Sequence, residues 1–411
     1  YDKLKAYSES DFYAFHMPGH KRNKALLGIE LPYDLDITEI DGFDDLHHAD
    51  GILKEEQERA ARVFGAEESH FLVNGSTAGI LSAVMGCTRR GDKILVARHC
   101  HKSIYHAIYM NGLVPRYVYP EFDISMHMNG EISKEDVAKA LEAEPDIKAV
   151  VIVSPNYDGV VSDVKGIAEV VHSYGIPLIV DEAHGPHFGF HPAFPERAND
   201  LGADVVINSL HKTLPSLTQT AILHINGKFA NRRRIKKYLD MLQSSSPSYI
   251  FMASLDACVD FLDGKCEEAF ELYVERLQKF REELEPLQHL QILRTEHYDI
   301  SKVVISTANA NITSPELADR LRKEYHLEME MTGGTYALAM TTVADTQEGL
   351  DRLKAALLEI DGQLEAKAAV SGSTEISGEL PRLEQYFTPQ EAADREEDGE
   401  AEEIPWKESE G

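Results

Sequence analysis

A lysine and an aspartate, each at the end of an apolar run, are the residues of this sequence best suited to chemistry. Lys212 follows the run 204–208 within Ser-Leu-His-Lys-Thr, and Asp181 closes the run 177–181. Open α/β sheets bind ligands at the carboxyl ends of their buried parallel strands. Lysine forms Schiff bases, and a carboxylate can keep a ring nitrogen protonated. The pair is therefore typical of a site for a pyridoxal cofactor, whose ring acts as an electron sink.

A turn of small polar residues is a third candidate for the site. Residues 74–79 read Asn-Gly-Ser-Thr-Ala-Gly, follow an apolar run and precede a segment of helical character. The turn would present backbone N–H groups and two hydroxyls at a helix N-terminus, a suitable cradle for a cofactor phosphate. Alone, such a turn more often only caps a helix. The prediction therefore depends on its occurrence together with the lysine and the aspartate.

Apolar runs rich in β-branched residues predict the strands that must position these groups. They lie at residues 93–97, 149–153, 177–181, 204–208 and 221–225. Because segments of helical period separate them, the pattern predicts an α/β domain with a mostly parallel sheet covered on both faces.

The pattern changes after about residue 255 and predicts a smaller α+β domain. The elements expected there are a helix over 267–284, strands near 302–306 and 336–341, and a helix that starts at Ser314 as its cap. The tail over 371–411 carries 13 acidic and 3 basic residues, which favours disorder or docking against the body over an interaction segment. The expected division is an N-terminal segment (1–50), a large cofactor-binding domain (51–255), a small domain (256–365) and the acidic tail (366–411).

The composition argues against several kinds of partner. Seventy acidic residues against 41 basic ones give a net charge of −29, which repels nucleic acid and anionic lipid. No apolar run approaches the roughly 18 residues of a membrane span. The cysteines show no Cys-x-x-Cys spacing, which predicts reduced thiols and a cytoplasmic protein; they are Cys87, Cys100, Cys258 and Cys266. A small cationic or zwitterionic ligand is the expected partner.

Several longer motifs follow one another in a fixed order along most of the chain. They are Phe-His-Met-Pro-Gly-His-Lys (15–21), Asp-Ile-Thr-Glu-Ile (36–40), Asp-Asp-Leu-His (44–47), Phe-Gly-Ala (64–66), the 74–77 turn, His-Cys-His-Lys-Ser (99–103), Ser-Pro-Asn-Tyr (154–157), Asp-Glu-Ala-His-Gly (181–185) and Ser-Leu-His-Lys (209–212). With these motifs the sequence resembles the pyridoxal 5′-phosphate (PLP)-dependent ornithine/lysine/arginine decarboxylases in their short bacterial form. The resemblance implies fold type I, the aspartate-aminotransferase fold.

The resemblance also implies an activity and the residues that carry it. A basic amino acid would lose CO2 to give a polyamine-pathway amine, in a homodimer or higher homo-oligomer. Lys212 would form the Schiff base with PLP, Asp181 would pair with the pyridine nitrogen, His101 would stack on the ring, and His184 would neighbour the ring's phenolic oxygen or the substrate carboxylate. The cofactor phosphate would be held by Gly75, Ser76, Thr77, Ser209, His211 and, across the dimer interface, Ser246. Full-length relatives continue past such an acidic stretch, so we expect the C-terminus to be truncated.

Two other PLP enzymes stay open. The α-oxoamine synthases carry the same Asp-Glu-Ala-His turn, but their lysine precedes a glycine-rich run, whereas residues 213–219 contain no glycine. Aminotransferases need an arginine for the α-carboxylate, for which the candidates are Arg294, Arg320, Arg322 and Arg352. The sequence does not choose among arginine, lysine and ornithine as substrate. Acidic residues that could bind the substrate's distal cation, such as Glu39, Asp41 and Asp44, are equally suited to loops and caps.

A metal-binding protein is the alternative from a different class. Potential ligands lie close together in the sequence, namely Asp181, His184, His187 and His191. The first two are already explained by a cofactor site, and no cysteine joins the group. We therefore expect no metal, and we expect the last two histidines to be hydrogen-bonded loop residues.

Overall fold

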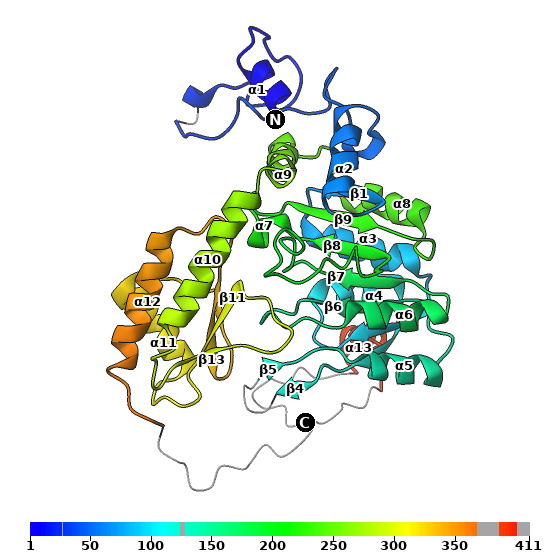
Figure 1. Cartoon of the computed structure of the whole chain (residues 1–411). Coiled ribbons are helices and arrows are strands. Elements are labelled where there is room, and N and C mark those ends of the chain that lie inside the picture. The colour runs from blue at the N-terminus through cyan, green and yellow to red at the C-terminus, as the bar shows by residue number, and fades with distance from the viewer. Residues whose placement is uncertain (27, 124–127, 368–385, 401–411) are drawn as a thin grey trace.

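A seven-stranded sheet forms the centre of the computed structural model, which describes residues 1–26, 28–123, 128–367 and 386–400 (Figure 1). The strand order is β1-β9-β8-β7-β6-β2-β3. The strands are β1 (Glu68–Leu72), β2 (Lys93–Ala97), β3 (Val114–Val118), β6 (Val150–Val153), β7 (Leu178–Asp181), β8 (Val205–Asn208) and β9 (Ala221–Ile225). β9 runs antiparallel to both of its neighbours, and the other six strands share one direction. The predicted mostly parallel sheet is confirmed.

Both faces of this sheet are buried, as the uninterrupted apolar runs predict. Along β2, Ile94 and Val96 pack into one core cluster, whereas Leu95 and Ala97 pack into another. The first cluster includes residues of α3 (Gly75–Cys87), α4 (Lys102–Asn111) and α8 (Arg232–Leu242), and the second includes residues of α5 (Lys134–Ala143) and α6 (Val164–Ser173). Alternate side chains of one strand thus hold helices on opposite faces.

The N-terminal part of the chain shares a core with the large domain. Its elements are α1 (Asp2–Ser8), the 3-10 turns η1 (Lys24–Leu26) and η2 (Leu46–His48), and α2 (Ile52–Val63). Leu4 and Ile37 pack in one cluster with Phe71 of β1 and with Leu255 of α9 (Tyr249–Leu262). The predicted boundary at 255/256 therefore cuts a continuous helix of this core. We propose that the small domain begins after α9.

The small domain is a four-stranded antiparallel sheet with helices on one face (Figure 1). The sheet order is β10-β11-β13-β12, with β10 (Gln291–Leu293), β11 (Lys302–Ser306), β12 (Met331–Thr332) and β13 (Tyr336–Met340); the helices are α10 (Glu267–Glu283), α11 (Ser314–Tyr325) and α12 (Gln347–Asp361). Along β11, Val303 and Ile305 pack in the cluster with the helices, whereas Val304 packs with Val160 of the large domain. The second face of the small sheet therefore packs against the large domain.

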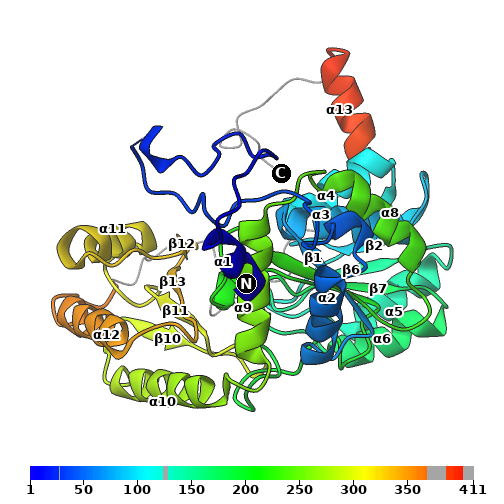
Figure 2. The ribbon, with the colours of Figure 1, turned by 90° about the horizontal axis from the view of Figure 1, so that it is seen from above.

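Two details concern the periphery. Thr313, not Ser314 as predicted, caps α11, because Glu316 at the third helical position completes a capping box with Thr313. Of the acidic tail, residues 366–367 and 386–400 are described, and the latter include α13 (Pro389–Glu397), which packs against α4 (Figure 2); residues 368–385 and 401–411 lie outside the described part.

Outside the two larger sheets, the described residues form one two-stranded sheet. β4 (Phe122–Asp123) pairs antiparallel with β5 (Met128–Asn129). All four cysteines are free thiols. Among the described residues, no helix combines the length and the apolarity needed to cross a lipid bilayer.

Candidate active site

One edge of the large sheet collects the segments that the sequence singled out. The helices α3 and α4 follow β1 and β2, Asp181 is the last residue of β7, and the short helix α7 (Leu210–Thr213) follows β8. These four strands share one direction, so their carboxyl ends meet at the same edge. The register pairs Asp181 with Ile207, next to the end of β8. The fold therefore brings Asp181 and Lys212 to neighbouring strand ends.

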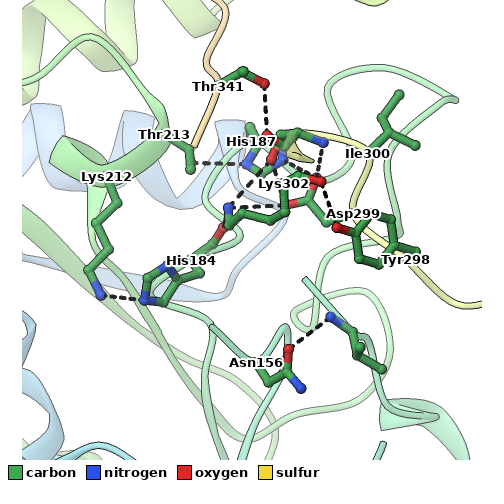
Figure 3. Close-up of polar contacts among 12 residues, drawn as sticks. Asn156, His184, His187, Lys212, Thr213, Tyr298, Asp299, Ile300, Lys302 and Thr341 are labelled. Carbon is green, nitrogen blue, oxygen red and sulfur yellow. Dashed lines mark hydrogen bonds and ion pairs between the residues drawn. The ribbon is translucent and has the colours of Figure 1, made fainter. Parts of the chain in front are cut away.

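Lys212 contacts a histidine of the neighbouring strand-end turn. Its Nζ lies 2.9 Å from His184 Nε2 (Figure 3). Burial first, and then the charges of Lys212 and Lys302, hold the pKa of His184 well below its usual value. Burial also lowers the pKa of Lys212, against the opposing charge of Asp181. The pair thus consists of a neutral imidazole and an amine that loses its proton more readily than an exposed lysine.

Asp181 is buried with few hydrogen-bond donors around it. Its side chain is only 4% exposed, and within the described parts of the chain it accepts one hydrogen bond, from the Ala183 N–H at 3.1 Å. Burial raises its pKa, and the charge of Lys212 opposes this shift. A buried carboxylate with spare acceptor capacity is suited to a cationic N–H donor such as a protonated ring nitrogen.

Two helix starts leave donors free for an anion. Gly75 opens α3 with φ of 72°, and the side chain of the N-cap residue Asn74 makes no cap hydrogen bond, because its oxygen accepts from Ser244 N–H instead. The Ser209 hydroxyl, at the N-cap of α7, is buried without a hydrogen-bond partner in the described structure. The Gly75 N–H itself donates to the Gln219 carbonyl at 3.0 Å, so the donors that fit a cofactor phosphate are the following N–H groups of the first turn of α3 and the Ser209 hydroxyl. Ser76 and Thr77 lie in the first turn of α3.

The remaining predicted site residues are His101, His211 and Ser246, and the structure gives the contacts of each. His101 is the N-cap of α4, and its Nδ1 lies 2.8 Å from Ser103 Oγ. Burial lowers the pKa of His101; the charge of Asp181 opposes this shift and that of Lys212 adds to it. His211 lies beside Lys212, with Nδ1 2.8 Å from the Thr220 carbonyl. Ser246 lies in an exposed turn with Ser244, and its contact across a dimer interface stays a prediction.

Sequence reasoning missed a carboxylate that the small domain brings to the site. The Tyr157 ring lies 4.5 Å from the His184 ring, and the Tyr157 hydroxyl donates a hydrogen bond to Glu330. Burial lowers the pKa of Lys212, and the negative charge of Glu330 is one of the smaller contributions that oppose this shift. Glu330 is 173 residues away from Tyr157 in the chain, so no local pattern links the two.

A buried ionic cluster joins the two domains behind His184 (Figure 3). Asp299 is fully buried; it accepts from Ser301 Oγ at 2.7 Å and lies 3.1 Å from His187 Nε2 and 3.3 Å from Lys302 Nζ. His187 Nδ1 lies 2.9 Å from the hydroxyl of Thr213, the residue after Lys212. Burial opposes the ionisation of Asp299, yet His187 and Lys302 hold its pKa well below the usual range.

Several of the alternative site residues make their contacts elsewhere. His191 Nε2 lies 3.0 Å from Glu271, and with His187 bound to Asp299 the described residues contain no group of three or more ligands placed for a metal ion. Arg320, Arg322 and Arg352 make their hydrogen bonds on the exposed surface of the small-domain helices. Asp44 accepts backbone N–H groups of residues 45, 50, 51 and 53, so it organises a loop.

Comparison with known proteins gives one family. Residues 1–366 match the family described as Orn/Lys/Arg decarboxylase, major domain. An arginine decarboxylase of Bacillus subtilis (strain 168) is 33% identical over 408 residues, which cover 95% of this chain and 83% of the relative.

Solved structures share the fold. The lysine decarboxylase of Francisella novicida superposes with a TM-score of 0.77 at 19% identity, over 88% of this chain and 59% of that one. An SPT solved with PLP superposes with a TM-score of 0.59 at 16% identity, over 76% of each chain. The architecture is thus that of fold-type I PLP enzymes, and because the family match spans most of its length, the chain belongs to the Orn/Lys/Arg decarboxylase family.

Proposed function

We propose that this protein is a PLP-dependent decarboxylase of a basic amino acid, with arginine as the first substrate to test. The observation that carries the proposal is the Lys212 amine held 2.9 Å from a neutral His184, beside a buried Asp181 that has spare acceptor capacity. The family and the names of the relatives, arginine and lysine decarboxylases, support this assignment.

The residues at the sheet edge fit PLP. The first turn of α3 and the unpaired hydroxyl of Ser209 would hold the phosphate, and Asp181 would accept a hydrogen bond from the ring nitrogen. When bound, PLP supplies an electron sink for the electron pair that departing CO2 leaves behind. Asp181 serves this chemistry because a buried carboxylate stabilises a proton on the nitrogen it faces.

Lys212 would supply the reacting amine, and His184 would contact it. A lysine must be neutral to attack an aldehyde, and burial favours the neutral amine. His184 Nε2 lies at hydrogen-bond distance from that amine, so the neutral imidazole can orient the Lys212 nitrogen. His184 Nδ1 is buried without a partner in the described structure, so it is free to contact a bound cofactor or substrate.

Glu330 is our candidate for the distal cation of the substrate. It is an exposed carboxylate of the small domain whose charge acts on Lys212, and Tyr157 orients it by a hydrogen bond. A guanidinium or ammonium at the far end of a basic amino acid is the natural partner of such a carboxylate. We also propose that the protein works as a homodimer, in which Ser246 approaches the phosphate bound by the partner.

Product analysis tests the proposed activity. The protein is incubated with PLP and separately with arginine, lysine or ornithine, and the amine product is identified by mass spectrometry while released CO2 is measured. We expect stoichiometric amine and CO2 from at least one substrate. Transfer of the amino group to a keto acid without CO2 release would contradict the proposal and favour an aminotransferase.

A further inference from the structure

A buried lysine of the small domain lies beside the site without a role in the proposed reaction. Lys302, the first residue of β11, has a side chain that is 0% exposed. Its Nζ lies 3.3 Å from Asp299 Oδ2, 3.4 Å from Ser301 Oγ and 3.4 Å from the His184 carbonyl oxygen. Burying an ammonium is costly even when it is paired, and an apolar side chain of similar volume would fill the same space without that cost.

The surroundings of Lys302 keep its ammonium in place. A Cβ atom at Gly159 would lie 2.8 Å from Lys302 Cγ, so the stem packs directly against the Gly159 backbone. Arg281 Nη2 and the Tyr298 hydroxyl donate to the Lys302 carbonyl at 2.9 and 2.6 Å. These contacts hold the stem and the backbone, and Nζ is directed toward the His184 carbonyl and Asp299.

Lys302 and Lys212 contact the same histidine at two different points. Lys212 meets the ring at Nε2, and Lys302 meets the backbone carbonyl (Figure 3). We propose that Lys302 is a positioning residue for the Lys212 amine: it fixes the backbone of His184, whose ring contacts that amine, and places a positive charge next to this histidine. This inference rests on the proposed function of Lys212.

The charges around Lys212 explain why such a cation is needed. Asp181 of β7 and Glu330 of the small domain both favour the charged lysine, whereas burial and Lys302 favour the neutral one. The remaining titratable neighbours are His184, His101 at the start of α4, and His211 of α7 itself. Burial and Lys302 thus act together against the two carboxylates, and a nearby cation is one established way to activate a lysine.

The pH dependence of Lys212 reactivity in the cofactor-free protein tests the inference. Competitive labelling with acetic anhydride, read by peptide mass spectrometry, gives the midpoint at which Lys212 becomes neutral. In Lys302→Met we expect this midpoint to rise by about one pH unit, and the labelling of Lys212 at pH 7.5 to fall about tenfold. Lys302→Arg keeps the charge and should restore the wild-type midpoint.

Control variants separate this electrostatic role from a structural one. Lys354→Met removes another small-domain lysine, one paired with Glu283 on the surface, and should leave the Lys212 midpoint unchanged. If Lys302→Met does not fold, Lys302→Gln keeps a hydrogen-bond donor for Asp299 and the His184 carbonyl, removes the positive charge alone and carries the same expectation. A midpoint in these variants equal to that of the wild type would overturn the proposal.

Failure of the inference can be told apart from failure of the proposed function. Borohydride reduction of the wild-type protein with PLP should fix a pyridoxyl group on Lys212. If Lys212 is modified but its labelling midpoint ignores Lys302, only the role of Lys302 is wrong. If Lys212 is not modified in the wild type, the proposed function fails, and the inference fails with it.

Discussion

Two buried aspartates act on the Lys212–His184 pair, Asp181 on the lysine and Asp299 on the histidine, and their surroundings differ. Asp299, at the domain junction, is surrounded by Ser301, His187 and Lys302, and its pKa is held low. Asp181, at the strand ends, accepts one backbone hydrogen bond in the described structure, and its pKa is raised. A carboxylate with a full set of partners stabilises the fold, whereas one with spare capacity is prepared for a partner that arrives later. This contrast distinguishes the structural cluster from the reactive one.

The contrast predicts that neutralising Asp181 lowers activity and that neutralising Asp299 lowers stability. We expect the larger effect from Asp181, on the decarboxylation rate. In Asp181→Asn we expect the decarboxylation rate to fall on the order of 10³-fold, because the ring nitrogen loses its anionic partner. The cofactor-free variant should melt at the wild-type temperature or above it, because ionised Asp181 is buried with little compensation. Steady-state kinetics and a thermal melt without PLP measure both effects. A large loss of stability together with normal kinetics would reverse the assignment.

Asp299→Asn should show the converse. The change leaves Lys302 and His187 without their anionic partner, and we expect the free energy of unfolding to fall by roughly 3–5 kcal/mol. Lys212 should still be modified by PLP and borohydride in the folded fraction. Denaturant titration checks the stability. An unchanged unfolding midpoint would show that the cluster does not stabilise the domain junction.

A third buried carboxylate, Glu182, sharpens the comparison through pH. Burial raises its pKa to about 8, so the native state keeps a proton that the unfolded chain has already lost above about pH 4.5. Stability should therefore fall as the pH rises toward 8, by roughly 2–3 kcal/mol between pH 6 and 8. Glu182→Gln should remove this pH dependence of stability, because glutamine does not titrate. The new amide can donate to the side-chain oxygen of Asn208, which has no partner in the described structure. Equal slopes in both proteins, measured by denaturant titration, would contradict a protonated Glu182.

The part of the site that follows single strands could be predicted from the sequence. Asp181 and Lys212 end or follow uninterrupted apolar runs, so their common edge follows from the parallel pattern. Lys302 and Glu330 could not be found this way, because Lys302 meets His184 across 118 residues of sequence and only the packing of the two domains brings them together. No local sequence pattern distinguishes Lys302 from a solvent-exposed lysine at the start of a strand.

The fold shows the same division between local and distant information. β9 has the apolar composition of its neighbours, and only its pairing reveals that it runs antiparallel to them. The cap of α11, by contrast, was predictable: Glu316 lies three residues after Thr313, which is the spacing of a capping box, and Ser314 does not meet it.

Peptide mapping after borohydride reduction shows whether Lys212 is the residue that binds PLP. The wild-type protein is mixed with PLP, reduced and digested, and every lysine-containing peptide is weighed. We expect one pyridoxyl group per chain, attached to Lys212, and none at that position in Lys212→Ala. A pyridoxyl group that lies on another lysine in the wild type, or no modification at all, would contradict this expectation.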